Sequence, residues 1–135
     1  MILFLDTTSS QIILALFKNQ QLIDKLIKEA SFHQAEILLK EIDKFLKRNK
    51  INLSQIKGII IVKGPGSFTG IRIGLAVANT ISFALKIPLW GIKKKSELDL
   101  KKIADLSACQ ENFKNQLVLP FYGNPPNITR GKKKI

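Results

Sequence analysis

The residues best suited to chemistry lie in two short loops and at the start of one helix. In the first loop, Asp6, Thr7 and Thr8 follow an apolar run, so a carboxylate and two hydroxyls stand where a strand would end. A carboxylate in that place can position a metal ion or a water molecule, and the hydroxyls can contact a nucleotide phosphate. The alternative is simple turn chemistry, in which Asp and Thr side chains bond to nearby backbone groups.

The second loop is GPGSFTG at residues 64–70, which joins a β-branched run to a predicted helix. The free N–H groups at a helix start can bind an anion, so Gly66 and Ser67 join the first loop as candidate nucleotide-binding residues. The loop is not a P-loop, because no Lys-Ser or Lys-Thr pair follows the glycines at the required spacing. The spacing alone favours a tight turn in which Ser67 is the N-cap of the helix.

Other arrangements that could support catalysis are weaker. His33 and Glu36 stand three residues apart and can share one face of a helix, but a lone histidine is more typical of a helix surface than of a metal site. Cys109 has no named partner, so no nucleophile–base pair is predicted. A two-metal nuclease is disfavoured, because the strand before Gly64 ends without an acidic residue. The sequence therefore predicts neither a metal site nor a catalytic residue.

Composition narrows the function classes. The chain has 135 residues, one cysteine, one histidine and a formal net charge of +12. These counts exclude a disulfide framework and a site of two imidazoles. The charge indicates either a nucleic-acid or acidic partner or a solvated lysine surface, and both interpretations stay open. No basic region precedes the apolar start, and polar residues interrupt the apolar stretch 70–92, so we expect a cytoplasmic protein without a membrane span.

The elements that must position these loops follow from local periodicity. Strands are predicted at residues 2–5, 11–17, 22–28, 56–62 and 89–92, and helices at residues 33–49 and 68–85. The order β-β-β-α-β-α-β predicts an α/β domain with a mixed sheet of the ribonuclease-H-like class, as in actin and the sugar kinases. Residues 1–92 form this predicted core domain. Residues 93–135 are expected to add a short helix, capped by Ser96, and a Pro-rich basic tail.

The two main helices carry different signals. In helix 33–49, Glu41 with Lys40, Lys44 and Lys47 indicates a face in water, and Leu39 widens the apolar stripe. Helix 68–85 is apolar on most sides and must be covered on most sides. Its cover is either the other helix or a partner chain.

Small residues mark one stripe of helix 68–85. Gly70, Gly74 and Ala78 stand four apart, which would allow a second helix to approach closely. If this stripe binds a partner, Gly74→Leu should abolish pairing and leave the fold intact. Loss of folding would instead assign Gly74 to internal packing.

Three segments resemble the TsaB (YeaZ) family. They are GPGSFTGIRIGLA at residues 64–76, ILFLDTT at residues 2–8 and HQAE at residues 33–36. The family works in making N6-threonylcarbamoyladenosine at position 37 of tRNA. The resemblance implies a non-catalytic scaffold that pairs with a TsaD-type transferase through the two helices, and that is joined by a TsaE-type ATPase. The His-x-x-x-His metal motif of TsaD-like members is absent, because Ile37 follows His33 by four residues.

This implied role suggests site residues and partners. We expect apolar contacts to the partner from Ile37, Ile71 and Leu75, polar contacts from His33, Glu36 and Arg72, and close approach at Gly70, Gly74 and Ala78. We expect a weak homodimer when the partner is missing, tRNA contact through the complex, no cofactor on this chain, and ATP or ADP elsewhere in the complex.

Typical family members carry a second, reduced domain, and we do not expect residues 93–135 to form one. Its tail segment 121–128 could dock back on the domain, or the tail lysines could contact tRNA phosphate. Two other function classes stay open. One is a small nucleotide hydrolase or peptidase that uses Asp6, and the other is a stand-alone basic RNA-binding module.

Overall fold

One mixed β-sheet organises the molecule. The computed structural model describes residues 1–30, 34–95, 99–109 and 112–123, and the side chains from residue 37 onward in the first helix. The strands are β1 (Ile2–Asp6), β2 (Gln11–Lys18), β3 (Gln21–Glu29), β4 (Gly58–Val62) and β5 (Leu89–Ile92), in the order β3-β2-β1-β4-β5. Strands β1, β2 and β3 form an antiparallel meander, and β4 and β5 run parallel to β1. The predicted α/β, ribonuclease-H-like fold is confirmed.

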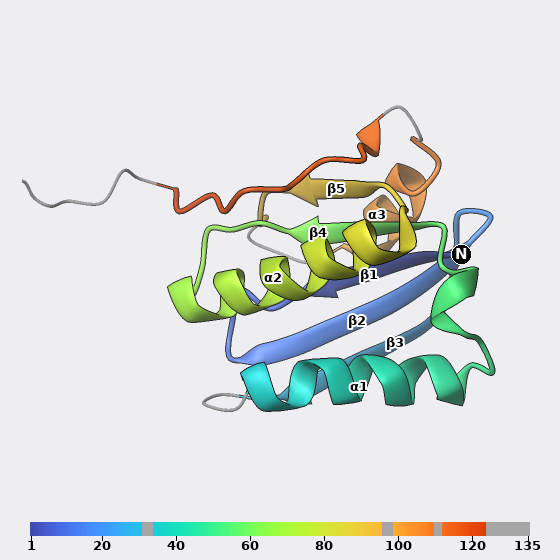
Figure 1. Cartoon of the computed structure of the whole chain (residues 1–135), viewed down its shortest axis with the longest axis horizontal. Coiled ribbons are helices and arrows are strands. Elements are labelled where there is room, and N and C mark those ends of the chain that lie inside the picture. Colours follow the sequence, from blue (N-terminus) through green and yellow to red (C-terminus); the bar gives the residue numbers. More distant parts are fainter. Residues whose placement is uncertain (31–33, 96–98, 110–111, 124–135) are drawn as a thin grey trace, which may run out of the picture.

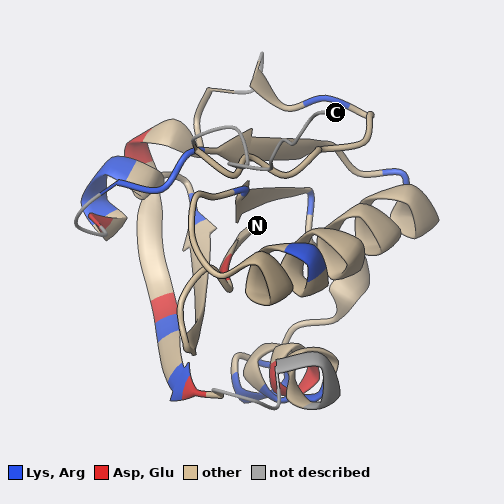
Figure 2. Ribbon diagram, turned by 90° about the vertical axis from the view of Figure 1, so that its left-hand side faces the viewer, with Lys and Arg blue, Asp and Glu red and all other residues tan. Residues whose placement is uncertain are grey.

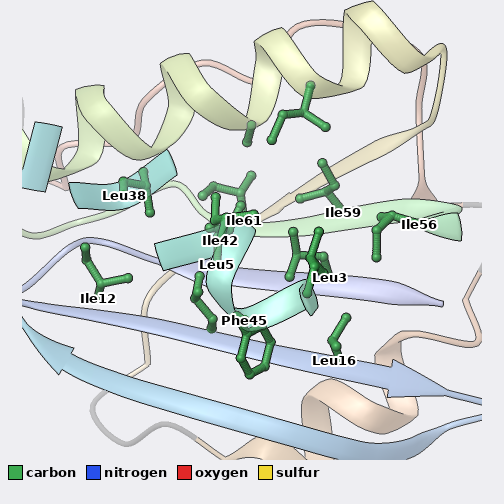
Figure 3. Packing of buried hydrophobic residues seen from close by; sticks show 14 of the residues in the cluster. Leu3, Leu5, Ile12, Leu16, Leu38, Ile42, Phe45, Ile56, Ile59 and Ile61 are labelled. Carbon is green, nitrogen blue, oxygen red and sulfur yellow. The ribbon is translucent and has the colours of Figure 1, made fainter. Parts of the chain in front are cut away.

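Helices cover both faces of this sheet. Helices α1 (Gln34–Arg48) and α2 (Phe68–Leu85) lie on one face, and α3 (Leu100–Leu106) lies on the other (Figure 1). In β1, Leu3 and Leu5 pack toward α1 and α2, while Phe4 packs toward α3. The β-branched run of β4 divides in the same way, which explains why the central strands read as continuous apolar runs. Figure 3 shows the larger cluster, where α1 lies over the strands.

Helix α1 buries its predicted apolar stripe, with two corrections. Glu41, expected in water, is only 6% exposed, and its carboxylate lies 3.6 Å from the Lys28 ammonium of β3 and 4.0 Å from that of Lys44. Leu39, expected to widen the stripe, is 59% exposed. The sheet turns α1 so that its polar flank meets β3, where an acidic side chain finds a lysine partner.

Strand β3 is an edge strand and less buried than its alternating pattern predicts. Leu22, Ile23 and Ile27 are exposed, although Leu26 of the same strand packs against the larger core cluster. The outer edge is not bare, since the guanidinium of Arg48 donates to the carbonyl of Lys25. A basic side chain at this position protects an edge strand against pairing with another chain.

The segment after β5 packs back on the same sheet. Helix α3 begins at Leu100 and is capped by Asp99, whose carboxylate accepts N–H groups of the first turn, so the predicted cap at Ser96 is wrong. Ser96 itself lies outside the described residues. Ile103 and Phe113 join the smaller core cluster beneath the sheet. Helix α3 and Phe113 therefore share a core with the strands.

An extended segment, residues 112–123, crosses the outer side of β5 and runs along α2; we name it the strap (Figure 1). Lys114 forms an antiparallel bridge with Leu89. Farther on, Val118 exchanges two hydrogen bonds with the Asn79 side chain, and the Phe121 N–H donates to the Lys63 carbonyl at 2.8 Å. The prediction that the tail segment docks back is confirmed for residues 121–123, and the remainder lies outside the described residues.

Candidate functional site

The loop after β1 is closed by its own hydrogen bonds. Asp6 is only 1% exposed, and its Oδ1 accepts the backbone N–H of Thr8 at 2.9 Å and the Thr8 hydroxyl at 2.6 Å. Its Oδ2 accepts the Lys94 ammonium at 3.0 Å. Sequence reasoning missed Lys94, which follows β5 by two residues. The buried carboxylate is thus matched by a cation from a distant part of the same chain.

The two candidate loops meet at the start of α2. The hydroxyl of Thr7 donates to the Gly70 carbonyl at 2.6 Å, and the Ser67 N–H donates to the Thr8 carbonyl at 2.7 Å. Ser67 is the N-cap of α2, as predicted, since its Oγ accepts the Gly70 N–H. At Gly66 any added Cβ would stand 2.4 Å from the Thr8 carbonyl oxygen. The structure thus brings all five candidate nucleotide-binding residues together. The hydrogen bonds that these residues form are those expected if they only build turns and a helix cap.

A cavity of about 820 Å³ opens beside Asp6 at the carboxyl ends of β1, β4 and β5. Trp90 and Ile103 contribute to its apolar part, and Lys94 and Lys102 to its basic part. Within the described part of the chain, no group of three His, Cys, Asp or Glu side chains could hold a metal ion.

The small-residue stripe of α2 faces the sheet. Gly70, Ile71, Gly74, Leu75 and Ala78 are all buried within the chain. A Cβ on Gly74 would lie 2.1 Å from the Thr7 Oγ1, so the glycine allows the β1 loop to approach this helix closely. These five residues therefore have no free surface for the partner contacts expected of them. The sequence alone does not say which side of an apolar helix meets the sheet.

The remaining predicted interface residues lie in different places. Ile37 is half-buried and packs against the main core cluster. Arg72 is exposed, and its Nε donates to the Tyr122 hydroxyl of the strap at 3.2 Å. Glu36 lies in α1, but its side chain is outside the described set, as is the whole of His33.

The side of α2 that points away from the sheet carries one charge, that of the exposed Arg72. We name its uncharged part the outer face; its residues are exposed or half-buried, and they are Thr69, Ile73, Ala76, Val77, Thr80, Phe83 and Ala84. Most residues of the outer face are small. Phe83, near the carboxyl end of α2, is 86% exposed. The only helix in the described residues that is long and apolar enough to cross a membrane is this one, and its other side packs on the sheet. An uncharged face of this length on a chain with 22 basic residues is typical of an interaction surface.

Comparison with known proteins agrees with this geometry. A family model described as TsaD, tRNA N6-adenosine threonylcarbamoyltransferase, matches residues 25–97. The tRNA threonylcarbamoyladenosine biosynthesis protein TsaB of Buchnera aphidicola from Schizaphis graminum is 36% identical over 100 residues, which cover 74% of this chain and 47% of that protein. The chain belongs to the TsaB (YeaZ) family. A second Buchnera aphidicola TsaB, from Baizongia pistaciae, is 41% identical over 88 residues, or 64% of this chain and 39% of that one.

A solved TsaB-family structure has the same fold. YeaZ from Pseudomonas aeruginosa superposes with a TM-score of 0.64 at 28% identity, covering 68% of this chain and 43% of that chain. The chain thus spans less than half the length of these relatives.

Proposed function

We propose that this chain is a non-catalytic supporting subunit in the biosynthesis of tRNA N6-threonylcarbamoyladenosine, and that it pairs with a TsaD-type transferase. Family membership supports the pathway. The observation that carries the pairing is the uncharged outer face of α2, which leaves a row of small apolar groups in water. Burial of such surface contributes roughly 25 cal/mol per Å² of apolar area, so a partner that covers it gains stability.

The chemistry of the outer face suits a second helix. Ala76, Thr80 and Ala84 are small, so two helix backbones can approach closely along this line. On α1, the exposed Leu39 offers a further apolar contact on the same side of the sheet. The docking residues that we propose are therefore those of the outer face, in place of the buried Gly70–Gly74–Ala78 stripe.

The loop after β1 supports a role without catalysis. Each oxygen of Asp6 accepts a hydrogen bond from within the chain, and the Thr7 hydroxyl is used inside the fold. A catalytic carboxylate must reach a substrate proton or a water molecule, and this one is occupied by Lys94. We propose further that the complex acts in the cytoplasm with a TsaE-type ATPase, contacts tRNA as a whole, and binds ATP or ADP on another subunit.

Light scattering coupled to size-exclusion chromatography tests the pairing. The chain mixed at tens of micromolar with the TsaD-type protein of its own organism is expected to elute as a heterodimer. Ala76→Glu, which puts a charge at the centre of the outer face, is expected to prevent the complex and leave the thermal melting of the chain unchanged. Ala108→Glu is the matched control, because Ala108 is exposed just after α3, on the other side of the sheet. Complex formation by Ala76→Glu, or none by the unmodified chain, contradicts the proposal.

A further inference from the structure

The amino ends of the parallel strands lie together at one end of the sheet. Strands β1, β4 and β5 begin there, β2 ends there, and the final turns of α1 and α2 point to the same end (Figure 1). We name this end the amino pole, and the opposite end, where Asp6 and the start of α2 lie, the carboxyl pole. The candidate site described above is at the carboxyl pole, so the side chains of the amino pole take no part in it.

Two lysines flank the start of β1 at the amino pole. Lys18 of β2 and Lys57, just before β4, each lie one residue outside the position that pairs with Ile2. The Lys57 N–H donates to the Met1 carbonyl at 2.8 Å. Burial lowers the pKa of the Met1 amino group, and the charges of the nearby Lys57 and Lys18 ammonium groups lower it further. Both lysines therefore act on the same small region of the surface.

The positive charge continues toward β5. Lys114 forms an antiparallel bridge with Leu89, the first residue of β5. Lys86, the C-cap of α2, lines a cavity of about 650 Å³ together with the two residues that follow Lys114. Lys18, Lys57, Lys86 and Lys114 are all exposed, and we name them the lysine row. Neighbouring strands lie about 4.8 Å apart, so the strand ends that carry the row span roughly 15 Å.

No described carboxylate neutralises the lysine row. The carboxylates of Asp24 and Asp43 lie in elements that begin or end at the amino pole, but both are already paired. Asp24 lies 2.8 Å from the Arg48 guanidinium, and Asp43 lies 2.9 Å from the Lys47 ammonium. Within the described residues, no carboxylate lies within ion-pair distance of any member of the row. The row is therefore free to meet an anionic partner.

The carboxyl pole, which faces the viewer in Figure 2, carries both signs of charge. There the Lys94 ammonium lies 3.0 Å from the Asp6 carboxylate, and the cavity beside this pair is lined by further lysines and by Asp99 and Asp105. Cations at the carboxyl pole are thus interleaved with carboxylates, whereas those of the lysine row are not. A high lysine content alone does not produce this difference between the two ends.

We propose that the lysine row binds the phosphate backbone of RNA. This inference rests on the proposed function, in which the complex contacts tRNA, and it adds the surface of this chain that does so. Ammonium groups without carboxylate partners bind a polyanion by releasing its condensed counterions. Exposed amide side chains near the row can donate further hydrogen bonds to phosphate and ribose oxygens. They are Gln20, Asn52, Gln55, Asn115 and Gln116.

Fluorescence anisotropy with the full chain tests this binding. The probes are labelled tRNA and a labelled RNA duplex of about 20 base pairs with an unrelated sequence. The unmodified chain should bind both with similar affinity, because phosphates carry no sequence information. The double variant Lys18→Gln, Lys57→Gln should bind both about tenfold more weakly at about 50 mM salt, and the slope of log affinity against log salt should fall by about two.

The double variant Lys101→Gln, Lys102→Gln is the matched control. Both residues are exposed on α3, which begins at the carboxyl pole, and the change in net charge is the same. We expect RNA affinity to change by less than about twofold, because salt screens charges that are far from the bound backbone. Equal weakening by the two double variants would mean that net charge and not the row is responsible, and would overturn the proposal.

Lysine acetylation with and without bound RNA locates the contact. Mass spectrometry should show severalfold slower modification of Lys57 and Lys114 when tRNA is bound, and unchanged modification of Lys101. Protection confined to lysines outside the row overturns the proposal. Vesicles of phosphatidylserine and phosphatidylcholine provide the membrane comparison. Tighter binding to these vesicles than to RNA, with the same loss in the Lys18, Lys57 variant, would assign the row to a membrane surface and overturn the RNA proposal.

The outcomes separate this inference from the proposed pairing. The Lys18→Gln, Lys57→Gln variant should still form the heterodimer with the TsaD-type protein, because both lysines lie at strand ends and not on the outer face of α2. A chain that pairs but does not bind RNA overturns this inference alone. A chain that binds RNA through the row but does not pair supports this inference and overturns the pairing.

Discussion

At the scale of single residues, Gly74 and Thr7 show how closely α2 is set against the sheet. The Thr7 hydroxyl donates to the Gly70 carbonyl, one turn before Gly74, and a Cβ at Gly74 would meet the same hydroxyl oxygen at 2.1 Å. No side chain fits in that space without a shift of the β1 loop. The glycine is therefore required by the contact between a helix and a loop of one chain.

Gly74→Ala is expected to destabilise the fold by about 1–3 kcal/mol, the usual cost of forcing an extra carbon into a packed interior. Urea unfolding measures this change. Thr7→Ala in the same chain removes the oxygen that the new Cβ meets, so the double variant should be less destabilised than the sum of the single ones. Simple additivity would show that the contact is not the cause.

Among the described acids, the carboxyl group of Asp24 has a clear shift in its pKa. Partial burial alone would raise the pKa of Asp24, but hydrogen bonds from the Asn49 amide and the Arg48 guanidinium lower it below its ordinary value of 3.8. The unfolded chain therefore binds more protons in acid than the folded chain does. The stability from this group is fully present above the ordinary pKa and is lost as the pH falls through the lower, folded value.

Asp24→Asn is expected to cost about 1 kcal/mol at neutral pH and to make stability fall less steeply below about pH 4. Urea midpoints measured across this range give both quantities. Asp43→Asn, which alters an exposed pair with Lys47, should follow the unmodified chain closely. A parallel acid loss in the Asp24 variant and the unmodified chain would contradict the assignment.

At the scale of elements, Asn79 fastens the strap to α2. Its amide donates to the Val118 carbonyl at 3.0 Å, and its carbonyl oxygen accepts the Val118 N–H at 2.9 Å. Val118 in turn packs on Gly91 of β5, where a Cβ would stand 2.5 Å from it. One asparagine thus holds the helix, the strap and the outermost parallel strand in register.

Asn79→Ala is expected to cost about 1–2 kcal/mol, because it leaves two half-buried backbone groups of the strap without partners. Hydrogen exchange of the Val118 amide should then be faster than that of amides in β4. Thr80→Ala is the control, since the Thr80 hydroxyl bonds only to Ala76 within the helix. Unchanged protection of Val118 would mean that the strap is held elsewhere.

The elements could be predicted from the sequence, and their orientation could not. The β-branched run of β4, the cap at Ser67 and the periodic stripe of α1 are local signals, and each gave the right element. Helix α2 carries two uncharged small-residue stripes, and the sequence does not show which of them meets Thr7. Ion pairs between residues far apart in the sequence could not be predicted either, because local patterns do not show which elements meet. Examples are Lys94 beside Asp6 and Lys28 beside Glu41.

At the scale of the whole molecule, the two core clusters lie on opposite faces of one sheet and share β1, β2 and β4. The chain has one tryptophan, Trp90, which stacks edge-on against Phe113 of the strap with ring centroids 5.6 Å apart. Its fluorescence therefore reports on the face that includes residues 93–123. Far-ultraviolet circular dichroism reports mainly on α1 and α2.

Urea unfolding followed by both signals is expected to give one coincident transition, since neither face can lose the sheet alone. A separate, earlier fluorescence transition would instead mean that residues 93–123 unfold as an independent unit. The comparison thus tests directly whether a boundary at residue 92 has physical meaning.

The ion pair between Asp6 and Lys94 also bears on how the protein is made. Its partners are 88 residues apart, and β4, the parallel neighbour of β1, follows only after α1. As the chain leaves the ribosome, the β1–β3 meander can form early. At that stage the Asp6 carboxylate at the end of β1 has no cation beside it, and the edge of β1 that later pairs with β4 is open. Non-local pairing of this kind is slow and exposes apolar strands meanwhile. The first strand therefore gains its parallel neighbour only when β4 has been translated, and Asp6 gains its cation only when Lys94 has followed.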